Sequence, residues 1–153
     1  TVDFCLELSS PASAQILFKM SSRCGRKNII MQTGLYGDIE LIIDDGEKQS
    51  KWNSDPGLIS VYGKHHVTVT IDNGPKIIQF VVDGNVCNGN NSRQYGWGRF
   101  VSDITDFELG QLLITKLKAD NIRPGGKLLR LDIYNRPLLN TEIIGIHRYY
   151  KSK

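Results

Sequence analysis

The sequence lacks the features that mark several common protein classes. No apolar run approaches the ~18 residues that cross a bilayer, and the longest, from Ile77 to Val82, is interrupted by Gln79. The 19 basic and 16 acidic residues leave a net charge of only +3, and the basic residues are scattered along the chain. A nucleic-acid-binding protein usually concentrates its basic residues on one face. We therefore expect neither a membrane nor a nucleic acid as a partner.

Cysteine is scarce and forms no metal-binding pattern. Cys5, Cys24 and Cys87 are the 3 cysteines, and an odd number leaves at least one free thiol. The spacings match neither a Cys-x-x-Cys pair nor a Cys/His zinc site. We expect three unpaired thiols, with a bridge between Cys5 and Cys24 as the alternative.

Catalytic motifs are also missing. The chain has no Gly-x-Ser-x-Gly sequence, and neither Cys24 nor Cys87 has a base close by in the sequence. His65 and His66 are adjacent, so on a strand they point to opposite faces and cannot bind one metal together. His65 is expected to be a packing residue of the sheet. These observations predict a chain without a catalytic centre.

Period-two alternation of apolar and polar residues is the dominant pattern. Val2, Phe4, Leu6 and Leu8 alternate with polar or small residues, which is typical of a strand with one buried face. Similar segments predict strands over 16–20, 28–32, 38–43, 65–72, 76–82, 85–87, 109–117 and 126–134. In the last of these strands, Leu129, Leu131 and Ile133 are expected to face inward.

Turn residues connect the middle segments into a meander. Asn73-Gly74 is a typical pair for a type I′ turn, which needs positive φ at both positions. Asp83-Gly84 predicts a second turn that leads into Asn85. Residues 88–100 combine glycine, asparagine and three large aromatic residues, and we interpret them as a long ordered loop.

Helical periodicity appears only near the end of the chain. Asn140 is a suitable N-cap, Glu142 favours a helix start, and Ile143, Ile144, Ile146 and Tyr150 form an apolar stripe. Many short strands with one terminal helix indicate an all-β, two-sheet antiparallel jelly-roll sandwich. We expect residues 1–153 to form one domain. Because the chain opens on Thr1 and at once on a strand, we expect a processed protein or a domain cut from a longer one.

Two segments resemble the concanavalin A-like, or laminin-G-like, jelly-roll domains. HHVTVTIDNGPKIIQFVVDGNVC (65–87) resembles the central meander of that superfamily, and GGKLLRLDIYNRPLLNTEIIGIHR (125–148) resembles its final strand and helix. Three features depart from the pattern. Lys64 replaces the tryptophan before the paired histidines, the strand that usually precedes Val2 is missing, and YGWGRF (95–100) is not part of the general pattern.

The resemblance implies a fold used by lectins, carbohydrate-binding modules and some glycoside hydrolases. In bacteria such domains often lie beside the catalytic domain of a secreted polysaccharide-degrading enzyme. It therefore implies a non-catalytic carbohydrate-binding accessory module, extracellular or periplasmic, whose partners are a glycan and a neighbouring catalytic domain in the same chain. The full-length parent is then expected to be a glycoside hydrolase.

Two aromatic loops are the candidate glycan sites, because a sugar site combines an aromatic platform with planar polar side chains. The indole of Trp97 has an alternative role as a plug at the end of the sandwich. For Trp52, the sequence leaves two alternatives open: a position on the surface or a packing position. The candidate ligand-binding residues are Trp52, Asn53 and Asp55 in one loop, and Asn91, Arg93, Tyr95, Trp97 and Arg99 in the other.

Other functions compete with glycan binding. A glycosidase would need two carboxylates across one bond; Asp38 and Glu40 share a strand face, but no third acid follows at Ile43. A structural sandwich that packs against a catalytic domain and a protein-binding adhesion module are further alternatives. We expect no cofactor. Calcium is an alternative, with the acidic residues Asp44, Asp45, Asp55, Asp103 and Asp106 in the loops that would hold it.

Overall fold

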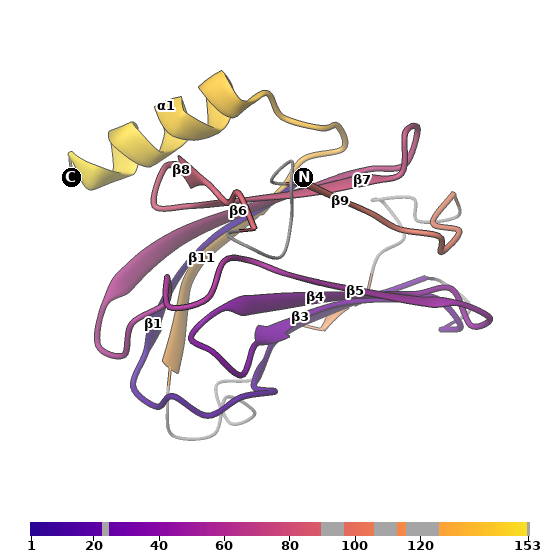
Figure 1. The fold of residues 1–153 in the computed structure, drawn as a ribbon, viewed down its shortest axis with the longest axis horizontal. Helices are drawn as coiled ribbons and strands as arrows, with labels where there is room; N and C mark the ends of the chain where they lie inside the picture. The colour runs from indigo at the N-terminus through magenta and orange to yellow at the C-terminus, as the bar shows by residue number, and fades with distance from the viewer. Residues whose placement is uncertain (23–24, 90–96, 106–112, 116–125, 153) are drawn as a thin grey trace.

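Two antiparallel sheets form the molecule, and the chain ends in a helix on the outer side of one of them (Figure 1). This computed structural model describes residues 1–22, 25–89, 97–105, 113–115 and 126–152, with the backbone alone for 113–115. The all-β sandwich expected from the alternation is confirmed. The elements are β1 (Val2–Leu8), β2 (Ile16–Ser21), β3 (Asn28–Thr33), β4 (Ile39–Asp44), β5 (Gln49–Asn53), β6 (Lys64–Asp72), β7 (Ile77–Val82), β8 (Asn85–Val86), β9 (Trp97–Arg99), β10 (Leu113–Thr115), β11 (Gly126–Ile133) and α1 (Asn140–Lys151).

The strand order brings distant parts of the chain together. One sheet has the order β11-β1-β6-β7-β8, with β9 pairing to β7, and the other has the order β10-β2-β3-β4-β5. The meander predicted over 65–87 is confirmed as β6-β7-β8. β9 lies within the segment 88–100 that we interpreted as a loop, so residues 97–99 correct that interpretation. Of the predicted strand 109–117, the described part is 113–115.

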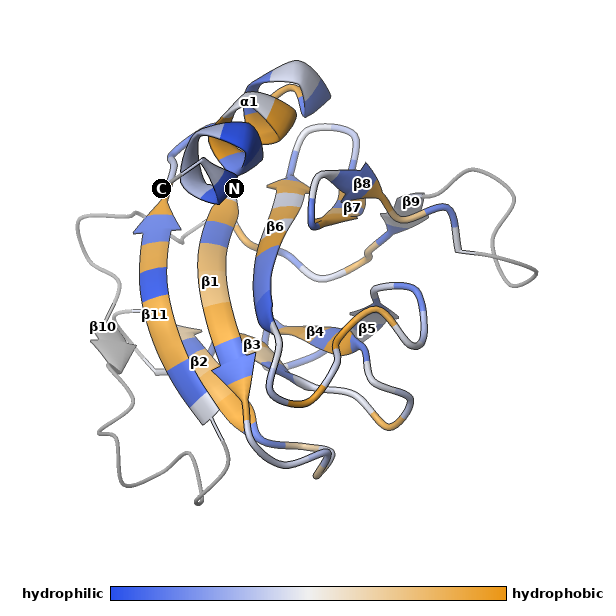
Figure 2. Ribbon diagram, turned by 90° about the vertical axis from the view of Figure 1, so that its left-hand side faces the viewer, coloured by the Kyte–Doolittle hydropathy of each residue, from blue (hydrophilic) through white to orange (hydrophobic). Residues whose placement is uncertain are grey.

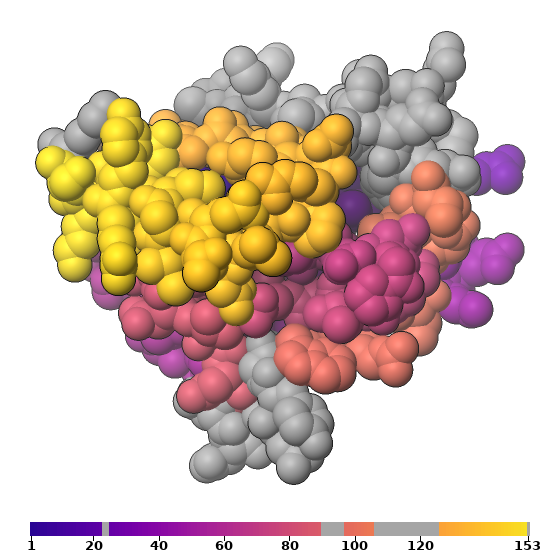
Figure 3. Space-filling view, turned by 90° about the horizontal axis from the view of Figure 1, so that it is seen from above, coloured from indigo at the N-terminus to yellow at the C-terminus, as the bar shows by residue number. Residues whose placement is uncertain are grey.

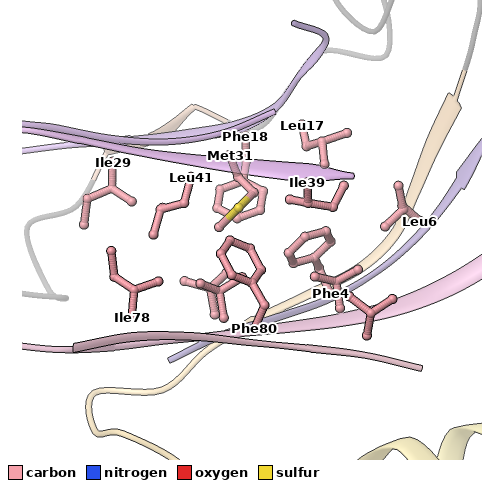
Figure 4. Packing of buried hydrophobic residues seen from close by; sticks show 14 of the residues in the cluster. Phe4, Leu6, Leu17, Phe18, Ile29, Met31, Ile39, Leu41, Ile78 and Phe80 are labelled. Carbon is pink, nitrogen blue, oxygen red and sulfur yellow. The ribbon is translucent and has the colours of Figure 1, made fainter. Parts of the chain in front are cut away.

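The core lies between the two sheets and consists of the apolar residues of each alternating strand. Phe4 and Leu6 from β1 face Leu17 and Phe18 from β2, and the rings of Phe4 and Phe18 meet edge to face at 5.4 Å (Figure 4). Bands of opposite hydropathy follow one another along β1 and β11 (Figure 2). Burial of one face of each strand therefore explains why the alternation specifies the pairing register.

Of the two predicted turns, the one at Asp83-Gly84 has type I′ geometry and the one at Asn73-Gly74 does not. Asp83 (φ 50°) and Gly84 (φ 78°) both have positive φ and join paired residues of β7 and β8, so the type I′ geometry belongs to them. Asn73 and Gly74 do not have positive φ, and the type I′ turn predicted there is wrong. A two-residue turn would require a backbone N–H from Pro75, which proline lacks.

A β-bulge in β11 corrects the expected direction of one side chain. The pairing of β1 with β11 shifts between Cys5 and Leu6, whose partners are Arg130 and Leu128. The extra residue, Leu129, is exposed, and Leu128 packs against the core in its place. A bulge adds one residue to one strand and so reverses the alternation beyond it.

The helix begins one residue earlier than predicted. The N-cap is Leu139, and its backbone N–H donates to Glu142 Oε2 at 2.8 Å. Glu142 lies three residues after the cap, where a glutamate can reach back, so its position determines the start of the helix. The apolar stripe packs Ile143 and Ile146 against Val81 and Leu138. α1 thus covers part of the outer face, away from the core, of the sheet that contains β1, β6 and β7 (Figure 3).

The sequence predicts three unpaired thiols, with a Cys5–Cys24 bridge as the alternative. Cys5 carries a free thiol, and burial raises its pKa. Cys24 lies outside the described residues. No helix in the described ranges is both long and apolar enough to span a membrane.

A buried polar cluster lies on the face of the sheet that α1 covers. Asp3 is fully buried, and its Oδ2 accepts hydrogen bonds from Thr68 Oγ1 at 2.6 Å and from His66 Nε2 at 2.8 Å. The Arg130 guanidinium is 3.3 Å from Asp3 Oδ1 and also contacts Asp132. Strand residues that count as outward-facing by alternation are therefore enclosed here.

We expect His147 of α1 to make the stability of the helix docking depend on pH. Its ring stacks on His66 at 5.4 Å, and burial, the neighbouring His66 and Lys151 lower its pKa from 6.5, against the opposing effect of Asp83. A lowered pKa means that the unfolded chain binds more protons than the folded chain just below pH 6.5. The contribution of His147 to stability is therefore expected to be complete above that pH and to be lost as the pH decreases.

Urea unfolding at several pH values between about 5 and 8 measures this effect. We expect His147→Gln to flatten the decline of the unfolding free energy between the two ends of the range. A variant with the same pH dependence as the wild type would contradict the assignment to His147.

Candidate functional site

A groove lies beside β5. This strand is at the edge of the second sheet (Figure 1). The groove has a volume of about 540 Å³, and we call it the β5 groove. The chain forms it from β5, the start of β4, the loops before β4 and after β5, and Gly89, which follows β8. The described lining residues are Leu35, Tyr36, Asp38, Glu40, Lys51, Trp52, Asn53, Ser54, Pro56 and Gly89.

The rim of the β5 groove presents an exposed aromatic side chain. Tyr36 is 70% exposed, and its backbone is nevertheless fixed, because its carbonyl accepts from Gly57 N at 2.8 Å. Gly37 has φ 66° and accepts from Ile59 N at 2.9 Å, so a left-handed residue turns the chain directly after the tyrosine. The neighbouring Leu35 is similarly exposed. The rim is therefore an ordered loop that carries two unburied apolar side chains.

The floor of the groove is polar and internally bonded. Asp38 is 3% exposed; its Oδ1 accepts from Tyr36 N at 2.8 Å and its Oδ2 accepts from Asn53 Nδ2 at 2.5 Å. A side chain at Gly34 would overlap this carboxylate, so the absence of a side chain at Gly34 leaves room for Asp38. Asp38 thus ties the rim loop to the end of β5.

Glu40 and Lys51 form the polar wall beside the floor. Glu40 pairs with Asn53 across β4 and β5, so both side chains are on the outer face of the sheet. Glu40 Oε1 accepts from Gln32 Nε2 at 2.7 Å and lies 3.7 Å from Lys51 Nζ. The wall therefore offers a partly exposed carboxylate and an exposed ammonium group.

The first candidate loop, expected between strands, is only partly a loop, because Trp52 and Asn53 belong to β5 and only Asp55 follows the strand. Trp52 and Asn53 are lining residues. Asp55 is buried, and its two oxygens accept from Asn88 N at 2.8 Å and Gly89 N at 2.7 Å. The Asp55 carboxylate thus fastens the beginning of the second predicted loop against the first.

The two tryptophans have different environments. The indole of Trp52 packs against the core and against Gly98, which leaves room for it by having no side chain. Trp97 is 38% exposed, so the alternative that it plugs the sandwich is wrong. Trp97 and Arg99 flank the buried Gly98 on β9 and point to the opposite side. They do not line the groove.

Three further predicted residues, Asn91, Arg93 and Tyr95, lie outside the described residues. Sequence reasoning missed Leu35 and Tyr36. A signal was present, because Gly34-Leu35-Tyr36-Gly37 places an aromatic residue between glycines, as in YGWGRF.

His65 takes part in a Ser-His-Asp arrangement at one end of β6. Its Nε2 is 2.8 Å from Ser60 Oγ, and its Nδ1 is 2.8 Å from Asp83 Oδ2. However, Ser60 N also donates to His65 Nε2 at 3.0 Å. The amide that could stabilise an oxyanion beside the serine is therefore directed at the ring. The arrangement ties a loop to the β7–β8 turn, in agreement with a structural role for His65.

The acidic loops considered for calcium are bonded within the chain. Asp45 Oδ2 accepts from Asp103 N at 2.6 Å, and Asp103 Oδ2 pairs with Lys27 at 3.0 Å. In the part of the chain that the structure describes, no group of three or more His, Cys, Asp or Glu side chains is arranged to hold a metal ion. Asp106 lies outside that part.

No protein-family model matches the sequence, and no curated protein matches it either. Solved structures do match in fold. The CBM40 module of the Ruminococcus gnavus IT-sialidase, bound to α2,3-sialyllactose, superimposes with a TM-score of 0.64 at 16% identity over 95% of this chain and 80% of that chain. Domains LG4-5 of the mouse laminin α1 chain give 0.56 at 16% identity over 92% and 37%.

A third match extends the comparison to another animal protein. The SAP-like pentraxin of Limulus polyphemus gives a TM-score of 0.56 at 11% identity over 95% of this chain and 68% of that chain. All three similarities agree on the architecture. The chain therefore has the concanavalin A-like jelly-roll fold that its two motifs indicated.

Proposed function

We propose that this chain is a non-catalytic carbohydrate-binding module and that the β5 groove is its glycan site. The observation that carries the proposal is the exposed Tyr36 beside the polar groups of Asn53 and Glu40. A sugar ring has an apolar face of C–H groups and an edge of hydroxyls. A ring stacked on Tyr36 would direct its hydroxyls towards the polar wall.

Each polar group has a defined part in this binding mode. The Nδ2 of Asn53 donates to Asp38, so its amide oxygen accepts from a sugar hydroxyl. Glu40 accepts a second hydroxyl through a charge-assisted bond, and Lys51 donates to a sugar oxygen. The sialyllactose bound to the R. gnavus CBM40 module supports a glycan as the ligand class for this fold.

The same groove has two carboxylates, yet its geometry favours binding over hydrolysis. Both oxygens of Asp38 accept hydrogen bonds from the chain, and its side chain is almost inaccessible. A glycosidase needs an acid that reaches the glycosidic oxygen. Asp38 instead holds Tyr36 and Asn53 in position.

We further propose that the module works outside the cell or in the periplasm, next to a catalytic domain of a longer secreted protein. Its fold neighbours include the carbohydrate-binding module of a sialidase and domains of a laminin chain, which support such a setting. Size-exclusion and activity measurements on the parent protein with and without this module would test its accessory role.

A glycan array followed by affinity electrophoresis, each with and without EDTA, tests the proposed function. Binding to at least one polysaccharide class supports it, and a loss with EDTA would add calcium to the site. Silence across plant and host glycans would contradict it. The alternatives of a structural sandwich or a protein-binding adhesion module would then be favoured.

Tyr36→Ala is expected to weaken glycan binding about tenfold or more, because the stacking platform is lost. The free energy of unfolding should change by less than ~0.5 kcal/mol, since Tyr36 is mostly exposed. Isothermal titration calorimetry and urea unfolding measure the two effects. Tyr149→Ala is the matched control: this exposed tyrosine is on α1, outside the groove, and its loss should leave affinity unchanged.

A further inference from the structure

The described lining of the β5 groove has more acidic than basic side chains. It contains two carboxylates, Asp38 and Glu40, and one cation, Lys51. We infer that, if the groove is the glycan site proposed above, it selects neutral glycans and disfavours glycans that end in a carboxylate sugar. This inference deepens the proposed function and rests on it.

The single cation is already engaged. Lys51 Nζ lies 3.7 Å from Glu40 Oε1, so a sugar carboxylate would have to compete with Glu40 for it. Lysine is also a point charge, whereas planar two-point recognition of a carboxylate is the property of arginine. No arginine is among the lining residues that the structure describes. An acidic sugar therefore finds no two-point partner in that lining.

The two carboxylates are fixed close to the space a ligand would occupy. Asp38 is held by Tyr36 N and Asn53 Nδ2, and Glu40 is held by Gln32 Nε2. Neither side chain can turn away from a ligand without losing these bonds. Repulsion between like charges is strong where water is partly excluded, and such repulsion is a common source of specificity.

The same carboxylates favour neutral sugars. A hydroxyl group donates to a carboxylate oxygen in a charge-assisted hydrogen bond, which is shorter and stronger than a neutral one. Glu40 and Asn53 are cross-strand partners on β4 and β5, so neighbouring hydroxyls of one sugar can reach both side chains. The described lining thus has acceptors for a polyol and contains no two-point partner for an acid. The sialyllactose seen in the R. gnavus module, at 16% identity, does not transfer to these residues.

Matched glycan pairs test the inference with the intact chain. The pairs are neutral glycans of a bound class, with lactose as the reference, and the same glycans carrying a terminal sialic acid or uronic acid. Calorimetry at low and at high salt measures both members of each pair. We expect the neutral member to bind about tenfold tighter or more at low salt, with a smaller difference at high salt because screening weakens the repulsion.

Glu40→Gln provides the assignment to a residue. It removes a charge while keeping a hydrogen-bonding side chain, so the affinity for the acidic member should rise several-fold relative to the neutral member. Glu47→Gln is the matched control, because Glu47 is an exposed acid in the β4–β5 turn outside the lining. It should leave the ratio of affinities unchanged.

The outcomes separate this inference from the proposed function. Binding of acidic glycans as tightly as neutral ones overturns the selectivity and leaves glycan binding intact. A preference for neutral glycans that Glu40→Gln leaves unchanged overturns the role of the groove charges. Absence of binding to every neutral and acidic glycan overturns both.

Discussion

Asparagine in place of Asp3 is expected to lower the free energy of unfolding by about 3 kcal/mol. Asp3 is 0% exposed, and its carboxylate accepts from His66 and Thr68 and faces the Arg130 guanidinium. The asparagine side chain keeps the shape but removes the charge. Its amide group also directs donors at partners that are themselves donors.

Urea unfolding at neutral pH measures this effect, and Asp132→Asn is the matched control. Asp132 contacts the same arginine, but its side chain is 43% exposed. Removing an exposed partner of an ion pair typically costs less than ~1 kcal/mol. Equal losses in the two variants would mean that the burial of Asp3 contributes nothing to the cluster.

The buried Asp3 also marks the limit of what alternation can predict. The pattern of Val2, Phe4 and Leu6 correctly predicted which face of β1 meets the core, because a strand with one apolar face has only one favourable orientation. The same pattern assigns Asp3 and Thr68 to the opposite face, which would be exposed in an open sheet. Here α1 and the side chain of Arg130 enclose part of that face, and only the tertiary structure reveals this cover.

The turns and the bulge differ in how far the sequence could have predicted them. Pro75 alone excludes a two-residue type I′ turn at Asn73-Gly74, since the turn needs an N–H that proline lacks. The information was therefore present in the sequence. The bulge at Leu129 was not, because Leu128 and Leu129 are identical in type and only the pairing with β1 decides which one faces the core.

The groove was predicted in part for the same reasons. An aromatic residue next to planar polar residues identified Trp52 and Asn53, and both line the groove. Tyr36 was missed although it lies between glycines, because the loop that carries it is distant in sequence and is brought to β5 by Asp38. Composition suggests an aromatic loop, but long-range hydrogen bonds decide which loops meet.

Gly98→Ala is expected to destabilise the chain by about 2–3 kcal/mol and to weaken glycan binding at the same time. A methyl group at this position would overlap the indole of Trp52, which packs against the core and forms one wall of the β5 groove. The indole must shift or β9 must leave β7. Either movement changes the wall on which a ligand would rest.

Gly145→Ala is the matched control, because a side chain there meets no atom within 4 Å and the residue lies inside α1. Alanine should stabilise the helix by about 0.5–1 kcal/mol and leave binding unchanged. Chemical unfolding and calorimetry on both variants separate the effects, since a general loss of stability would not change affinity in the folded fraction. If Gly98→Ala lowers stability but binds glycan as tightly as the wild type, Trp52 only packs the sandwich and the binding surface lies on Tyr36 and the polar wall alone.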